Sequence, residues 1–175
     1  MLKIISIVVI VLVAGVLILA ATKPDTFSVQ RSASIKAPPA KIYAFIDDFK
    51  RWGTWSPYEK LDPAMKRTLS GAPKGNGAIY AWQGDGNVGA GRMEITDAIE
   101  ASKVTIKLDF MKPFEAHNTA EFTLVPRGDA TEVTWAMQGP LPYVAKVMHM
   151  FFNMDSMVGK DFEAGLVNLK TIAEQ

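Results

Sequence analysis

The sequence predicts an α+β protein in which a curved antiparallel β-sheet surrounds a long C-terminal helix, preceded by one N-terminal transmembrane helix. Three observations support this prediction. An apolar run of eighteen residues lies between Ile4 and Ala21. Segments in which apolar and polar residues alternate fill the middle of the chain, from about 27 to 138. Apolar residues then recur every three or four positions from Val144 to Ile172, as in an amphipathic helix.

The apolar run from Ile4 to Ala21 predicts a membrane anchor. It contains no charge, proline or amide side chain, and only Ser6 and Gly15 dilute its Ile, Val, Leu and Ala residues. As a helix it would span about 27 Å, close to the hydrocarbon thickness of a bilayer. The run is longer than the apolar region of a signal peptide, and no clean Ala-x-Ala cleavage site follows it. We therefore expect residues 1–22 to form an uncleaved, single-pass anchor.

The charges beside this run indicate its orientation only weakly. Lys3 precedes it, whereas Lys23 and Arg31 follow it, so the positive-inside rule is nearly balanced. A short N-terminal tail before a long domain resembles a signal anchor, which predicts a soluble domain on the extracytoplasmic side. We expect residues 23–26 to be a linker and residues 27–175 to form one domain, long enough to bury a core.

Charge and cysteine content argue against several functions. Beyond residue 22 the chain carries 18 basic and 18 acidic residues. A net charge of zero argues against nucleic acid as a partner, because nucleic-acid binding usually needs a basic surplus. Without cysteine the chain can form neither a disulfide nor a thiolate metal site. His117 and His149 have no partner at metal-binding spacing, so we expect no metal and no cofactor.

The expected domain begins with a strand and a helix. Apolar residues alternate from Phe27 to Ile35, which predicts a first strand. The prolines at 38 and 39 end it, because proline cannot donate a ladder hydrogen bond, and they suit the first turn of a helix. Apolar residues at helical spacing then predict a helix from Pro39 to Phe49.

Six further strand-like segments follow an irregular, aromatic-rich stretch. Each later segment combines one apolar and one polar face, which is typical of an antiparallel sheet. The motif at Gly84-Asp-Gly86-Asn-Val-Gly89 fits G-x-G-x-x-G, but strand alternation follows it instead of a helix. We therefore interpret it as a hairpin turn and reject a dinucleotide site. The predicted segments cover about 65–69, 78–83, 92–99, 104–110, 120–124 and 133–137.

One long amphipathic helix is predicted from Val144 to the C-terminus. Gly159 and Gly165 lie within it, although each costs about 1 kcal/mol relative to alanine by helix propensity. They indicate either a close approach to the sheet or a bend. A sheet with one apolar face and a single sizeable helix to cover it leaves room for an apolar pocket between the two.

Several short motifs occur in this setting: Ala37-Pro38-Pro39, Trp52-Gly-Thr-Trp55-Ser56-Pro57-Tyr58, Asp62-Pro63-Ala-Met65, Met154-Asp155 and Gly159-Lys160-Asp161-Phe162. Together they resemble the polyketide cyclase/dehydrase-like branch of the START-like (SRPBCC, Bet v 1-like) superfamily, over about Phe27 to Ala173. The resemblance implies a helix-grip fold with a deep apolar cavity. Members of the superfamily bind lipids, sterols or polyketides, and some cyclise a bound chain. No catalytic motif accompanies the matched residues, so the catalytic residues are unknown.

The expected ligand contacts are side chains that strand or helix parity places inward. Arg31 shares a face with Val29 and Ile35, where a buried guanidinium needs a carboxylate or a ligand anion, unless a bulge turns it outward. Asn118 shares parity with Ala120, so it is a second inward polar group. Apolar stripes of this kind are equally typical of an ordinary core. The apolar candidates placed inward in this way are Tyr80, Trp82, Phe110, Phe122, Trp135, Met137, Met148 and Phe151. Trp52 and Trp55 precede the strands, and they either line the mouth of the pocket as ligand contacts or plug that end.

Three hypotheses of function follow. The first is a membrane-tethered domain that binds an apolar or amphipathic small molecule, such as a lipid, between sheet and helix, with Arg31 or Asn118 orienting its polar head. The second is a cyclase/dehydrase-type enzyme, which needs a proton-transfer group facing the cavity; Tyr80, Arg31 and Asn118 are weak candidates. The third is a non-catalytic interaction module whose cavity is filled by its own side chains. The ligand and the oligomeric state do not follow from the sequence.

Overall fold

The computed structural model describes residues 2–151 and 153–175. Within these residues one helix precedes the sheet strands, short helices follow the first strand, and two helices end the chain. The elements are α1 (Leu2–Ala21), β1 (Thr26–Ile35), α2 (Pro39–Ile46), the 3₁₀ helices η1 (Phe49–Thr54) and η2 (Pro57–Lys60), β2 (Lys66–Gly71), β3 (Ala78–Gln83), β4 (Ala90–Ile99), β5 (Lys103–Lys112), β6 (Ala116–Arg127), β7 (Ala130–Pro140), α3 (Tyr143–His149) and α4 (Met154–Ala173).

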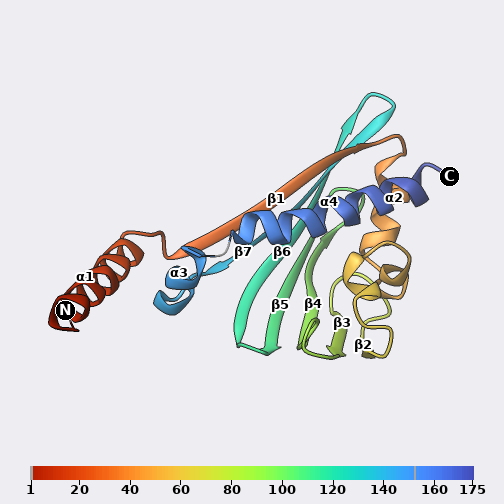
Figure 1. Cartoon of the computed structure of the whole chain (residues 1–175). Helices are drawn as coiled ribbons and strands as arrows, with labels where there is room; N and C mark the ends of the chain where they lie inside the picture. The colour runs from red at the N-terminus through yellow and green to blue at the C-terminus, as the bar shows by residue number, and fades with distance from the viewer. Residues whose placement is uncertain (1, 152) are drawn as a thin grey trace.

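The strands form one curved antiparallel sheet in the order β1-β7-β6-β5-β4-β3-β2 (Figure 1). Strands β2 to β7 pair with their neighbours in the chain, and β1 pairs with β7 from Thr26↔Pro140 to Ile35↔Thr131. Buried residues alternate with more exposed ones along β6 and β7. The predicted α+β class and antiparallel sheet are confirmed, and the Gly84–Gly89 motif connects β3 to β4 as a hairpin.

Helix α4 lies along the concave face of this sheet, where its closest strand partner is β1 (Figure 1). Two glycines allow the close approach. A Cβ atom added at Gly159 would collide with the guanidinium of Arg31, and one added at Gly165 would crowd the indole of Trp135. Of the two interpretations of these glycines, close approach to the sheet is therefore confirmed.

Helix α2 is shorter than predicted. It ends at Ile46 and not at Phe49. Asp48 caps the next element, since its carboxylate accepts a hydrogen bond from the backbone N–H of Lys50 at 3.0 Å. Aspartate favours such local side-chain to backbone bonds over continuation of a helix. The chain thus turns into η1, which carries Trp52 across one end of the sheet.

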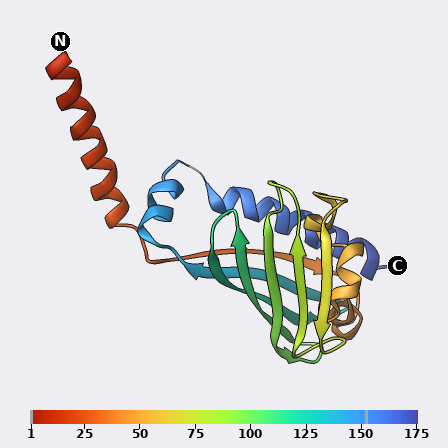
Figure 2. The same ribbon diagram turned by 90° about the horizontal axis from the view of Figure 1, so that it is seen from below.

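The prediction of a single C-terminal helix from Val144 is wrong in one respect, because the structure has two helices in this region. Helix α3 ends at His149 and α4 begins at Met154. Asn153 caps α4, its side-chain oxygen accepting a hydrogen bond from the backbone N–H of Ser156 at 3.0 Å, and asparagine is among the preferred residues at this position. Figure 2 shows α3 apart from α4, beside the end of α1.

Helix α1 extends away from the sheet (Figures 1 and 2). Its residues Lys3–Ala21 are long and apolar enough to cross a membrane, and 6% of that segment is buried. Such exposure argues against the core helix of a soluble protein, although a signal sequence meets the same criteria of length and composition. The end of α1 contacts α3, where Tyr143 Oη donates a hydrogen bond to the carbonyl oxygen of Leu17 at 2.7 Å.

Candidate functional site

Four of the predicted ligand contacts form an aromatic cluster between α4 and the sheet. Trp52, Trp55, Phe122 and Trp135 are each at most 4% exposed. The rings of Trp135 and Phe162 stack with their centroids 4.0 Å apart, and Phe122 stacks on Trp135 at 4.9 Å. Such pairs attract one another beyond the gain from area burial. The rings of this cluster therefore occupy the interior beneath α4 and pack on one another.

Two indole N–H groups attach the cluster to the end of α2. Trp52 Nε1 donates to the carbonyl oxygen of Ile46 and Trp55 Nε1 to that of Phe45, each at 3.0 Å. Carbonyl groups in the last turn of a helix have no intrahelical partner, so these bonds satisfy them. The two tryptophans close this end of the interior. Their role as ligand contacts stays a prediction.

Four further predicted contacts, Tyr80, Trp82, Phe110 and Met137, lie on the same face of the sheet. Tyr80 and Met137 are buried, at 4% and 7% exposed. Trp82 and Phe110 are half-buried and lie edge-on, with centroids 5.7 Å apart. The inward direction predicted from strand alternation is therefore confirmed for the two buried residues.

Asn118 on β6 is buried on this face, as predicted, and is 8% exposed. Among the described residues no donor reaches its Oδ1 atom. A Cβ atom added at Gly139 on β7 would collide with this oxygen and would lie 3.1 Å from the ring of Phe27 on β1. An unpaired buried acceptor costs about 1–3 kcal/mol. Asn118 is therefore a polar group that an incoming hydrogen-bond donor would stabilise.

A pocket adjoins Phe27, between the start of β1 and the segment that joins α3 to α4. Its volume is about 550 Å³, within the range of small-molecule sites. We name it the Phe27 pocket. It is lined by Lys23, Pro24, Thr26, Phe27, Ser28, Val29, Leu141, His149, Met150, Phe151, Asn153 and Asp155.

The Phe27 pocket combines apolar and polar side chains, six of each among its twelve described lining residues. The imidazole of His149 lies edge-on to Phe27 at 6.3 Å, and burial lowers its pKa, so it is neutral at pH 7. Hydrogen bonds from Arg31 lower the pKa of Asp155, which is therefore ionised. Lys23 adds an exposed cation at the edge. A lining that mixes apolar and polar side chains suits an amphipathic molecule.

Arg31 has protein partners on α4. Its Nη1 lies 3.0 Å from Asp155 Oδ1, and its Nε lies 2.7 Å from Glu163 Oε1. The register between β1 and β7 is continuous through Arg31, so no bulge turns it outward. Of the two expected partners, a carboxylate or a ligand anion, the structure supplies carboxylates. A ligand contact by Arg31 stays a prediction that these bonds do not support.

Met148 and Phe151 do not face the sheet, contrary to the expectation for the last helix. They are 43% and 68% exposed. The expectation assumed one continuous helix, and the interruption before Asn153 places both residues outside α4. Phe151 nevertheless lines the Phe27 pocket, whereas Met148 lies on the surface of α3.

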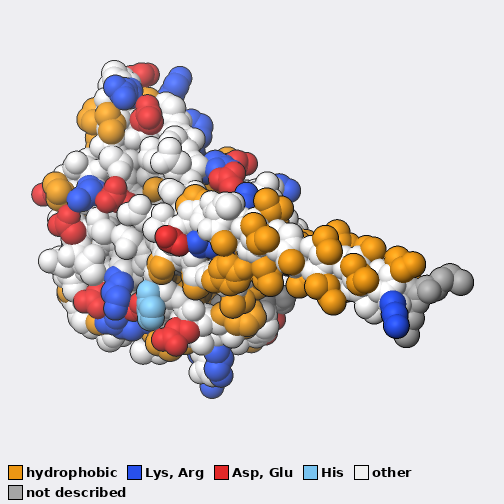
Figure 3. All heavy atoms as spheres, turned by 90° about the vertical axis from the view of Figure 1, so that its left-hand side faces the viewer, with side chains coloured by type: hydrophobic (Ala, Val, Ile, Leu, Met, Phe, Trp, Pro, Cys, Tyr) orange, Lys and Arg blue, Asp and Glu red, His pale blue; other side chains and the backbone are white. Residues whose placement is uncertain are grey.

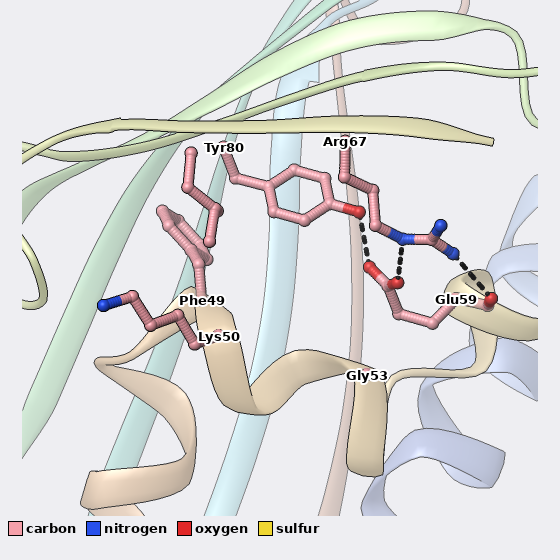
Figure 4. A pocket seen from close by; sticks show the side chains of 7 residues that line it. Phe49, Lys50, Gly53, Glu59, Arg67 and Tyr80 are labelled. Carbon is pink, nitrogen blue, oxygen red and sulfur yellow. Dashed lines mark hydrogen bonds and ion pairs between the residues drawn. The ribbon is translucent and has the colours of Figure 1, made fainter.

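A second pocket, of about 360 Å³, lies under η1 and η2 beside β2 and β3 (Figure 4). We name it the Tyr80 pocket. It is lined by Phe49, Lys50, Gly53, Glu59, Arg67, Leu69 and Tyr80.

Glu59 is the centre of a polar cluster in the Tyr80 pocket (Figure 4). Its carboxylate accepts hydrogen bonds from Tyr80 Oη at 2.5 Å and from Arg67 Nε at 2.6 Å. Burial, and then the bond to Glu59, raises the pKa of Tyr80, so the phenol stays protonated and donates. The three side chains join η2 to β2 and β3. Sequence reasoning missed Glu59 and Arg67. The available signal was strand parity, which places Arg67 on the same face as Leu69, the partner of Tyr80.

Among residues 2–151 and 153–175, no group of three or more His, Cys, Asp and Glu side chains is placed to hold a metal ion. The described geometry thus consists of two surface pockets beside an aromatic core. One pocket is lined by equal numbers of apolar and polar residues and adjoins α3, and the other contains a hydrogen-bonded Tyr–Glu–Arg cluster.

A curved antiparallel sheet wrapped around a C-terminal helix defines the class of Bet v 1-like, helix-grip proteins. The fold is similar to that of protein CV1439 from Chromobacterium violaceum, with a TM-score of 0.60 and 12% identity over 87% of this chain and 99% of that one. It is also similar to Ara h 8.0201, with a TM-score of 0.55 and 12% identity over 85% and 97% of the two chains. Identities this low show a common fold only.

The di-domain aromatase/cyclase BexL of the BE-7585A biosynthetic pathway gives a TM-score of 0.66 at 17% identity. The match covers 90% of this chain and 53% of BexL, so this chain spans about half of that protein. A search of the curated proteins found no match. The chain belongs to the polyketide cyclase/dehydrase and lipid transport family, whose family model matches residues 26–174.

Proposed function

We propose that this protein binds an apolar or amphipathic small molecule, such as a lipid, in the Phe27 pocket, while α1 holds it at a membrane. The observation that carries this proposal is the place of the pocket. Half of its twelve described lining residues are apolar, and the lining includes Lys23 and Pro24, which follow α1 after Thr22. The description of the family includes lipid transport. An apolar ligand that concentrates in a bilayer would reach such a pocket over a short distance.

The aromatic cluster is the reason for placing the ligand at this end of the molecule. Trp135 and Phe162 stack beneath the middle of α4, which leaves the sequence-based expectation of a deep cavity between sheet and helix without support there. The Phe27 pocket lies at the N-terminal end of α4, where Asn153 and Asp155 line it. We therefore move the proposed ligand from the middle of the interior to its α3 end.

Asn118 is the group that we assign to the polar head of the ligand. Its unpaired Oδ1 lies close to the ring of Phe27, which lines the pocket. A ligand that displaces this ring and carries a hydroxyl or amide N–H would satisfy the oxygen. Because a buried acceptor gains most from such a bond, Asn118→Ala should weaken binding of hydroxyl-bearing ligands more than binding of alkanes.

We further propose that α1 is not cleaved and crosses the bilayer once, with the domain on the extracytoplasmic side. The length of α1 and the exposure of its side chains support the span. Protease added to intact cells should degrade the domain if this orientation holds, and a domain that stays protected until lysis would contradict it.

Native mass spectrometry of the full chain, released from detergent after exposure to a membrane lipid extract, tests ligand binding. We expect a bound species in the wild type and its loss in Met150→Trp, which fills the Phe27 pocket. Met111→Trp is the matched control, because Met111 is 58% exposed and outside the pocket. A wild-type protein that stays empty in the extract would contradict the proposal.

The aromatic cluster favours a second candidate, a non-catalytic interaction module with a filled core. Trp55 and Phe122 are fully buried, which is the packing that this hypothesis requires. The same experiment distinguishes the two candidates, because an interaction module would stay empty in the wild type and in both methionine variants.

The Tyr80 pocket is the observation that favours an enzyme of the cyclase/dehydrase type. It brings ionisable side chains, among them Lys50 and Glu59, to one open cavity. Glu59 is bonded to both Tyr80 and Arg67, however, and a carboxylate held in this way also has a plain structural role. Loss of turnover of a polyketide-like substrate in Glu59→Gln, with unchanged thermal stability, would support the enzyme.

A further inference from the structure

Helix α3 and the turn after it expose several large apolar side chains. Val144 is 72% exposed, Met148 is 43% exposed, and Phe151, in the turn after the helix, is 68% exposed. Their spacing of four and three residues places them along one side of the helix. In Figure 3, hydrophobic side chains gather at the base of α1 and continue along it. We call Val144, Met148 and Phe151 the α3 ridge.

The opposite side of α3 is fixed to the chain that leaves α1. Lys146 is 6% exposed, and its Nζ bonds Asp25 Oδ1 at 2.5 Å. Tyr143 at the start of α3 donates its hydroxyl hydrogen to the carbonyl oxygen of Leu17 at 2.7 Å. These two bonds orient α3, so the ridge points away from the linker and not into it.

The bond to Leu17 also sets the depth of α3 relative to α1. Leu17 lies four residues before the end of α1, which is about 6 Å along a helix axis. If α1 crosses a bilayer and Ala21 marks the edge of the hydrocarbon, this carbonyl lies about 6 Å inside that edge, close to the interface where tyrosine is enriched. Amphipathic helices that lie in this boundary bury their apolar side about 5–10 Å deep.

We infer that the α3 ridge inserts into the surface of the bilayer in which α1 ends, and so turns the Phe27 pocket toward the lipid. The inference rests on the proposed membrane span of α1. The occupant is a lipid surface, because α3 contacts the end of α1 and Tyr143 of α3 bonds the carbonyl oxygen of Leu17, so the exposed ridge adjoins the apolar surface of α1. Phe151 belongs both to the ridge and to the lining of the pocket, so membrane contact and pocket access involve the same side chain.

The absence of cysteine from the chain allows a direct test. Single cysteines at positions 144, 148 and 151 of the full chain are labelled with an environment-sensitive fluorophore in phosphatidylcholine vesicles that contain spin-labelled phosphatidylcholine. We expect blue-shifted emission and loss of most of the fluorescence at all three. Val167→Cys is the matched control, because Val167 is also exposed, at 60%, but lies on α4; its label should keep the emission it has in water.

A label at Leu12→Cys separates this inference from the membrane span itself. Quenching at 12 together with water-like emission at 144, 148 and 151 would overturn the inference and leave the span intact. Water-like emission at 12 as well would overturn both. Emission at the ridge that is blue-shifted but not quenched by spin-labelled lipid, and that depends on protein concentration, would show a second copy of the chain on the ridge and would also overturn the inference.

Discussion

Asp47 is a buried carboxyl group at the end of α2 with unusual surroundings. It is 4% exposed, its Oδ1 accepts no hydrogen bond from a described residue, and Lys74 Nζ lies 4.0 Å from its Oδ2. Burial raises its pKa. A carboxyl group whose pKa is raised by folding binds its proton more tightly in the native state. It therefore stabilises that state below its unfolded pKa and loses this contribution as the pH rises through its folded pKa.

Asp47→Asn should consequently be more stable than the wild type at pH 7, because it removes a buried charge. The advantage should disappear at pH 3, where the carboxyl group is protonated in both states. Thermal unfolding at the two pH values measures the difference. Asp129→Asn, in an exposed hairpin, is the control, and an equal gain in both variants would show that net charge and not burial is responsible.

Gly139 tests the placement of Asn118. Alanine at this position should destabilise the protein by about 1–3 kcal/mol, as overpacking of a core does, because its Cβ atom would overlap Asn118 Oδ1. Urea unfolding measures the effect. In the Asn118→Ala background the same substitution should cost much less, since the two sites couple. Additive costs, or an equal cost for Gly86→Ala, which has open space around it, would contradict the placement.

At the scale of elements, strands were easier to predict than the helix break. Alternation is a local property, and β5, β6 and β7 each contain the predicted segment. The apolar spacing of the C-terminal region, by contrast, continues across the break, so periodicity alone favours one helix. Asn153 was the local signal for a new helix start. An asparagine alone does not show that a helix is broken before it. The break also depends on the contact of α3 with α1, which local spacing does not reveal.

If the α3 ridge contacts lipid, charges on it should slow ligand uptake. Val144→Asp with Met148→Asp should reduce the rate at which the protein takes up a fluorescent lipid from vesicles. Binding of the same lipid from detergent should stay unchanged, because neither residue lines the Phe27 pocket. A matched pair of aspartates at Val167 and Met157, both exposed on α4, should leave the uptake rate unaltered. Equal slowing of uptake by both pairs would contradict the proposed contact of the α3 ridge with lipid.

For the whole molecule, the decisive feature is the aromatic cluster between α4 and the sheet. Phe162→Ala should destabilise the protein by about 3–5 kcal/mol, as deletion of a buried aromatic ring does. The cavity it leaves should bind a small aromatic compound that the wild type does not bind. Calorimetry with benzene and urea unfolding measure both effects. Val167→Ala, on the exposed side of the same helix, should change stability by less than about 0.5 kcal/mol.

The sequence by itself determined the α+β class, the strands, the apolar N-terminal helix and the inward direction of Tyr80, Met137 and Asn118. These features follow from residue spacing, because strands and helices have fixed periods. Only the tertiary structure decided that Trp135 and Phe162 stack, that Arg31 meets Asp155 and Glu163, and that Glu59 meets Tyr80. Such contacts join residues far apart in the chain. The contacts of Phe162 and Arg31 depend on how closely α4 approaches the sheet, which Gly159 and Gly165 set. The contact of Glu59 depends on how η2 packs on β2 and β3. No local pattern measures either.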